Sequence, residues 1–148
     1  MTDMAQLVAD LQRDEGWRPF LYDDASGTPI KAGVIVRGHP TIGFGFALDI
    51  APLTQAECLP ILTGRATSAA QTLLHAAPWI ADLSEPRQRA LSNMAYNLGV
   101  TGLLKFDTFL GLMQQGKFDQ AANDLEGTPW YQETGERALR IVALIRTG

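Results

Sequence analysis

Two carboxylates and a threonine in the first third of the chain have the types and spacing needed to cut a glycosidic bond. Glu15 stands in an Asp-Glu-Gly string, Asp24 ends Tyr-Asp-Asp, and Thr41 opens Thr-Ile-Gly-Phe-Gly. Such a cleavage needs an acid that protonates the leaving oxygen and a second carboxylate on the opposite face of the sugar. Taken singly, each residue has a simpler explanation as a surface, turn or strand residue.

The composition limits the class of protein. The chain has 148 residues, 46% hydrophobic and 19% charged, which is typical of a globular protein of one domain or two small lobes. Its formal charge of -4 argues against a nucleic-acid partner, because phosphate binding needs a basic surface. With one cysteine, Cys58, and two histidines, His39 and His75, we expect no intramolecular disulfide, no metal and no cofactor.

The N-terminal third is predicted to combine one helix with a β-rich segment. Apolar residues at helical spacing predict a helix that starts near Thr2 or Asp3, ends at residues 13–15, and is terminated by Gly16. These apolar residues are Met4, Leu7, Val8 and Leu11. Over residues 20–46, glycine, proline and β-branched residues alternate, which predicts short strands and turns around residues 28–30, 33–36 and 41–43.

The rest of the chain is predicted to be helical. A capping box, Thr54-x-x-Glu57, indicates a helix from about residue 55 into the middle seventies, with Pro60 inside it. Further helices are expected from Ser84-Glu85-Pro86 to Gly99, over 108–115 and 118–125, and over 135–146. The apolar positions expected to face inward are Ala90, Leu91, Met94, Ala95 and Leu98, then Ala138, Ile141, Val142 and Ile145.

Considered together, the three N-terminal strings resemble the signature of phage-type lysozymes, the endolysins of glycoside hydrolase family 24. Asn93 to Gly99, Thr101-Gly102, Trp130-Tyr131 and the segment from Arg137 to the C-terminus resemble later parts of that family in the same order. The resemblance implies a mostly α, α+β lysozyme-like fold in a single catalytic domain. It implies a small lobe over about 16–54, a connecting helix over about 55–75, a helical lobe over about 76–148 joined by the N-terminal helix 3–14, and a cleft between the lobes.

The resemblance also implies roles for the N-terminal trio. Glu15 would be the general acid, Asp24 would activate or orient a water, and Thr41 would help hold that water. The choice of Asp24 over Asp23 rests on the family's Tyr-x-Asp spacing. The family cleaves the β-1,4 bond between N-acetylmuramic acid and N-acetylglucosamine in peptidoglycan. Members are mostly inverting, so we expect the two carboxyl groups to be about 6.5–9.5 Å apart.

Four further residues are candidate substrate contacts. Tyr96 and Asn97 match family positions that face the saccharide, and Phe109 is a candidate for the lining of the cleft. Arg137 matches a position that approaches the general acid in this family. For Tyr96, sugar stacking and core packing are equally favoured, whereas for Phe109 a place in the core is favoured. The family also pairs the positions of Asp14 and Arg140.

The chain departs from the family's best-known members in two places. The spacing between Asp24 and Thr41 is longer, and residues 28–39 are expected to form an enlarged hairpin or loop at the cleft rim that contacts peptide stems or further sugars. Phe46 stands where some relatives have a histidine.

Bacterial peptidoglycan is therefore the expected partner of a monomeric enzyme without a membrane anchor. No N-terminal apolar run suggests a signal peptide, so we expect synthesis in the host cytoplasm and release by a separate holin-type membrane protein. A domain of a larger toxin or tail protein fits equally well. Three other interpretations stay open: a catalytically inactive wall-binding module, a transglycosylase or chitinase-like relative, and a structural helical protein.

Overall fold

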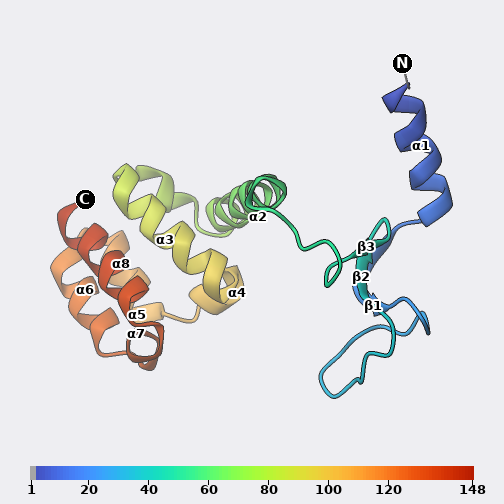
Figure 1. Cartoon of the computed structure of the whole chain (residues 1–148). Helices are drawn as coiled ribbons and strands as arrows, with labels where there is room; N and C mark the ends of the chain where they lie inside the picture. The colour runs from blue at the N-terminus through green and yellow to red at the C-terminus, as the bar shows by residue number, and fades with distance from the viewer. Residues whose placement is uncertain (1–2) are drawn as a thin grey trace. The chain divides into compact units, whose positions relative to one another are not determined.

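The computed structural model describes residues 3–148, which form two compact units (Figure 1). The first unit extends to Cys58, and the second comprises Leu59–Gly148. The chain is mostly helical with one small sheet, as the sequence predicts for an α+β protein.

The first unit begins with α1 (Met4–Glu15), which confirms the predicted N-terminal helix. The Asp3 carboxylate caps it by accepting hydrogen bonds from the backbone N–H groups of Ala5 and Gln6, at 3.0 and 3.1 Å. Gly16 ends it with a φ of 69°, a conformation that favours glycine. The apolar side chains of α1 are exposed within the first unit. The helix therefore owes its ends to local capping.

A three-stranded antiparallel sheet follows, with the order β1 (Arg18–Asp23), β2 (Pro40–Gly43) and β3 (Phe46–Ala47). Its register places Tyr22 opposite Thr41. The end of β1 and the start of β2 are therefore neighbours, although a long connection separates them in the sequence.

That connection is the enlarged loop expected over residues 28–39. Its only strand-like pairing among the described residues is an isolated bridge between Tyr22 and Pro29. The strand predicted over residues 33–36 was wrong. The Val34 N–H donates to Lys31 O in a turn, and the Arg37 N–H donates to a side chain, so this segment has no partner strand. Its apolar side chains are exposed.

Helix α2 (Gln55–Ala76) confirms the predicted capping box. The Thr54 N–H donates to Glu57 Oε2 at 2.8 Å, and the Glu57 N–H donates to Thr54 Oγ1 at 3.3 Å. Pro60 lies inside this helix, as expected.

The second unit continues with a series of short helices. They are η1 (Pro78–Asp82), α3 (Glu85–Leu98), α4 (Val100–Leu103), α5 (Asp107–Gln114), α6 (Phe118–Glu126), α7 (Pro129–Thr134) and α8 (Glu136–Thr147). Four of these were predicted within about two residues at each end. The helices η1, α4 and α7 were not predicted, because elements of four to six residues are too short to display a helical period.

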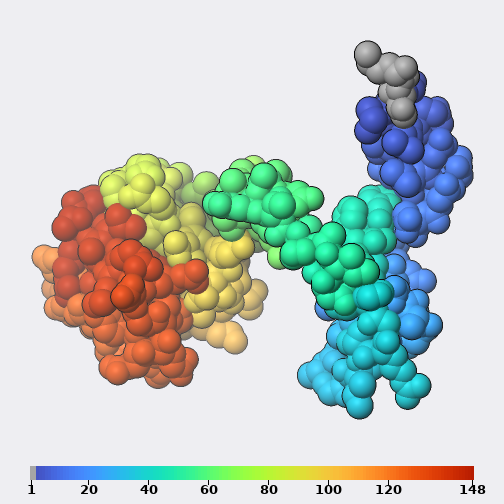
Figure 2. Space-filling model, viewed as in Figure 1, coloured from blue at the N-terminus to red at the C-terminus, as the bar shows by residue number. Residues whose placement is uncertain are grey.

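The hydrophobic core of the second unit forms where α3, α5, α6 and α8 pack together. Helix α3 buries Ala90, Leu91, Met94 and Ala95, and α8 buries Ala138, Ile141, Val142 and Ile145, as predicted. Figure 2 shows the side chains of the C-terminal helices α6 and α8 meeting on the face in view.

This core predicts a clear contrast between two leucines. Leu91 is fully buried, whereas Leu139 on α8 is 57% exposed. We expect Leu91→Ala to lower the free energy of unfolding by about 2–5 kcal/mol, because it leaves a cavity. The matched variant Leu139→Ala should change it by less than about 0.5 kcal/mol. Urea denaturation followed by circular dichroism measures both, and equal effects would contradict this description of the core.

Candidate active site

Glu15 is the last residue of α1, and its carboxylate lies against the glycine turn between β2 and β3. A Cβ atom added at Gly45 would meet this carboxylate, only 2.9 Å from Glu15 Cδ. Gly45 also has a φ of 74°, which disfavours other residues. The rings of Trp17 and Phe44, with centroids 5.1 Å apart, join the end of α1 to the same turn. The turn therefore needs glycine here so that its backbone can approach Glu15.

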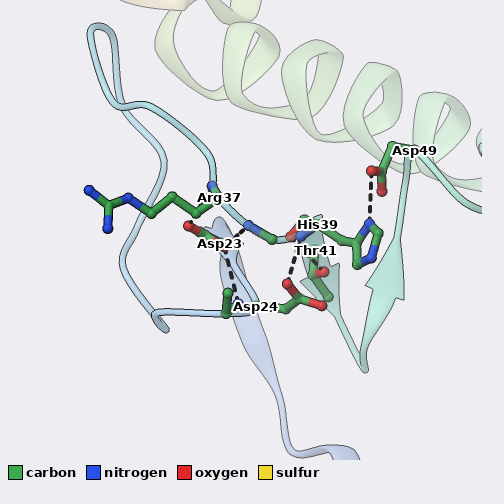
Figure 3. Close-up of polar contacts among 8 residues, drawn as sticks. Asp23, Asp24, Arg37, His39, Thr41 and Asp49 are labelled. Atoms are coloured by element: carbon green, nitrogen blue, oxygen red, sulfur yellow. Dashed lines mark hydrogen bonds and ion pairs between the residues drawn. The ribbon is translucent and has the colours of Figure 1, made fainter.

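Asp23 and Asp24 are neighbours with different environments (Figure 3). Asp23 is only 2% exposed, and its carboxylate accepts hydrogen bonds from three backbone N–H groups. The donors are Arg37 at 3.0 Å, Gly38 at 2.9 Å and Ala25 at 3.1 Å. The Arg37 N–H, and then those of Gly38 and Ala25, hold the pKa of Asp23 below its usual value, although burial acts in the opposite direction. Asp23 thus anchors both ends of the long loop.

Asp24 is exposed, and its Oδ1 accepts a hydrogen bond of 2.6 Å from the His39 backbone N–H. Its Oδ2 has no hydrogen-bond partner among residues 3–148. Of the two aspartates, Asp24 is the one that offers a carboxylate oxygen to solvent. The choice of Asp24 as the catalytic residue, made from the Tyr-x-Asp spacing, stays a prediction.

Thr41 is 3% exposed, and its hydroxyl donates to the His39 carbonyl oxygen at 3.1 Å. The Asp24 N–H donates to the same carbonyl, also at 3.1 Å. Asp24 and Thr41 therefore share the His39 carbonyl oxygen as an acceptor, and Figure 3 shows the three residues side by side. Because the Thr41 hydroxyl has given away its only proton, it can bind a water only as an acceptor.

One further pair in this region had no clear signal in the sequence. His39 Nδ1 lies 2.9 Å from Asp49 Oδ2, and both side chains are about half exposed. The hydrogen bond and charge of Asp49 raise the pKa of His39, and the hydrogen bond from His39 lowers the pKa of Asp49. His39 and Asp49 are ten positions apart in the sequence, and the folded sheet brings their side chains together.

The second unit holds the candidate saccharide contacts. Tyr96 is 41% exposed, so it is a surface residue and not a core residue. It lines an open hollow of about 360 Å³ together with Arg137. Leu62, Ala66, Arg89, Ser92 and Asn93 complete the lining.

Two further candidates have different surroundings. Asn97 is exposed, and its Oδ1 accepts a hydrogen bond of 3.1 Å from Trp130 Nε1. Phe109 is only 1% exposed and belongs to the core, which is the place that the sequence favours, so we do not retain it as a sugar contact.

The charged positions Asp14 and Arg140 each have a neighbour within their own unit. Asp14 accepts from Arg13 at 2.9 Å, and Arg140 lies 3.3 Å from Glu136. Within residues 3–148, no three His, Cys, Asp or Glu side chains gather in a way that would hold a metal ion. No helix in this range is both long and apolar enough to cross a membrane.

Comparison with known proteins identifies the class to which this fold and site belong. The sequence pattern of the phage lysozyme family, described as "Phage lysozyme", matches residues 12–146. The chain belongs to this family, and with it to the glycoside hydrolases.

Individual relatives differ in how much of their length the chain covers. It is 26% identical to a probable T4-type lysozyme 1 of Dictyostelium discoideum, with 98% of this chain and 96% of the relative aligned. It is 30% identical to the pre-baseplate central spike protein of Enterobacteria phage T4, over 93% of this chain. The chain spans only 27% of the length of that spike protein. The domain therefore matches both a stand-alone protein and part of a larger one.

The contacts of Asp23 predict how the unfolding free energy depends on pH. Its pKa is lowered in the folded state, so its contribution is present above the usual value, about pH 4, and is lost as pH falls through the lowered value. In Asp23→Asn an amide N–H₂ replaces one acceptor oxygen and faces a backbone donor. We expect a lower urea midpoint at pH 7 and a shallower loss of stability toward pH 3 than in the wild type.

Asp24→Asn is the matched control, since Asp24 is exposed and accepts a single backbone hydrogen bond. The urea midpoint of Asp24→Asn at pH 7 should stay close to that of the wild type. If Asp24→Asn destabilised the protein as much as Asp23→Asn, the structural role assigned to Asp23 would be wrong.

Proposed function

We propose that this protein is a muramidase that hydrolyses the β-1,4 bond between N-acetylmuramic acid and N-acetylglucosamine in bacterial peptidoglycan. The observation that carries the proposal is that Asp24 and Thr41 are both held by the backbone of His39. Membership of the phage lysozyme family also supports it.

The two groups are suited to orient one water molecule. The carboxylate of Asp24 and the hydroxyl oxygen of Thr41 are both acceptors in this arrangement. A water that donates one proton to each of them would direct its lone pairs away from both, toward an anomeric carbon. Deprotonation of this water by Asp24 as it attacks is general-base catalysis.

Glu15 would supply the acid. It stands on a different element from the other two, and the glycine at position 45 leaves its carboxylate free of a facing side chain. In the proposed reaction Glu15 protonates the glycosidic oxygen while water attacks from the opposite face, which inverts the anomeric configuration. The separation of about 6.5–9.5 Å between the Glu15 and Asp24 carboxyl groups stays a prediction.

The hollow that contains Tyr96 and Arg137 is the proposed saccharide contact of the second unit. A half-exposed tyrosine ring suits the apolar face of a pyranose, and the guanidinium group donates to hydroxyl or acetamide oxygens. The amide nitrogen of Asn97, whose Oδ1 accepts from Trp130, would also donate to the sugar. We also propose that the loop 28–39 contacts peptide stems or further sugars.

The relatives fit two settings for this activity. As a stand-alone enzyme, the protein would be an endolysin made in the host cytoplasm, acting as a monomer and reaching the wall through a separate holin-type protein. The likeness to a baseplate spike protein fits a wall-degrading domain of a larger assembly. The proposed chemistry is the same in both.

Glu15→Gln tests the proposed acid. Loss of the proton donor should lower the rate of lysis of isolated peptidoglycan by about 10²–10⁴-fold, since general acids contribute factors of this size. Turbidity loss measures the rate, and circular dichroism checks folding. Glu133→Gln, an exposed glutamate on α7, is the control and should lyse as the wild type does. Equal activity of wild type and Glu15→Gln would overturn the mechanism. Binding without lysis by the wild type would instead identify a wall-binding module.

Asp24→Asn and Thr41→Val test whether these two residues orient the attacking water. Both should lower hydrolysis, by about 10²-fold or more for Asp24→Asn, because the base is lost. Mass spectrometry of the wild-type products should show hydrated reducing ends. Anhydro ends, together with retained activity in both variants, would indicate a transglycosylase, which uses the acid alone.

A further inference from the structure

The backbone of His39 contacts both residues assigned to the water. Its N–H donates to Asp24 Oδ1 at 2.6 Å. Its carbonyl oxygen accepts from Thr41 Oγ1 and from the Asp24 N–H, each at 3.1 Å. A shift of the His39 backbone would therefore move Asp24 and Thr41 together, so whatever fixes His39 also fixes the proposed water site.

The imidazole of His39 holds the same residue through its side chain. Its Nδ1 bonds to Asp49, which lies just beyond β3 (Figure 3). The backbone around Asp49 is itself held, since Leu48 N–H donates to Pro40 O at 3.0 Å and Ala51 N–H donates to Ala47 O at 2.9 Å. The ring thus connects the end of the long loop to a closed turn on the opposite side of β2.

The charges that raise the pKa of His39 come from three aspartates. Asp49 contributes most, from the turn after β3. Asp24 and Asp23 act on the ring from the residue after β1 and from the end of that strand. The surroundings therefore favour the protonated, charged ring.

We propose that His39 is a positioning residue for hydrolysis: its ring, paired with Asp49, holds the His39 backbone where Asp24 and Thr41 share one water. This inference rests on the proposed muramidase function.

The pair works over a defined range of pH. The pKa of His39 is raised above its usual value, so its contribution is complete below about pH 6.5 and is lost as pH rises through the raised value. The pKa of Asp49 is lowered, so the partner stays ionised until pH falls through that lowered value. Between these limits the pair is intact, and turnover should decline on the alkaline side as the ring loses its proton.

The test compares His39→Ala, His39→Asn and Asp49→Asn on soluble, uncross-linked glycan strands. His39→Ala should lower kcat about tenfold with KM within twofold, since a small misplacement of reacting groups affects the transition state most. His39→Asn keeps a donor close to the position of Nδ1, so it should recover most of kcat. It should lack the alkaline decline, because its amide does not titrate. Asp49→Asn should weaken that decline by removing the negative partner.

His75→Ala is the control, because His75 is exposed on α2. It should match the wild type in kcat and pH profile. The inference is overturned if His39→Ala retains the wild-type kcat and pH profile while Glu15→Gln is inactive, a result that leaves the muramidase function standing. It is also overturned if the loss in His39→Ala follows only the fraction of folded protein. Activity in Glu15→Gln would instead overturn the proposed function itself.

Discussion

The buried carboxylate of Asp23 is the interaction on which the rest of the first unit depends. The chain leaves β1 at this residue and returns at Pro40, and the returning backbone is fastened by two hydrogen bonds from Arg37 and Gly38 to Asp23. These two hydrogen bonds help to offset the conformational entropy that is lost when this long and largely irregular loop closes. Satisfying a buried carboxylate with backbone donors offsets its desolvation and fixes where β2 begins. The start of β2 at Pro40 in turn sets the positions of its neighbours His39 and Thr41.

The two adjacent aspartates show how one position in the sequence separates structure from chemistry. Asp23 is the last residue of β1 and is buried, whereas Asp24 is the first residue after the strand and is exposed. The buried carboxylate gains backbone donors and loses solvent, and the exposed one keeps an oxygen open to solvent. A single-position difference therefore decides which carboxylate is available to a water.

How much of the fold and of the candidate site could be predicted from the sequence depended on how far apart in the chain the interacting residues lie. The capping box at Thr54, the glycine ends and the apolar faces of α3 and α8 are local, and the sequence predicted them correctly. The strand expected over residues 33–36 was wrong because β propensity there has no partner strand to act on. The pairing of His39 with Asp49 depends on the closed sheet, and neither residue carries a local signal for it. For Tyr96, only its exposure separated a surface role from a core role.

Glycine placement gives a physical reason for the motif that frames the site. A Cβ atom at Gly45 would collide with the Glu15 carboxylate, and one at Gly38 would collide with Asp24 and Ala25. Each of the two proposed catalytic carboxylates therefore lies against a backbone that has no side chain of its own. Gly45 belongs to the Thr-Ile-Gly-Phe-Gly string, whereas Gly38 belongs to the long loop. Gly38 therefore lets the backbone at the end of the long loop pass close to Asp24, and there the neighbouring His39 N–H donates to Asp24 Oδ1.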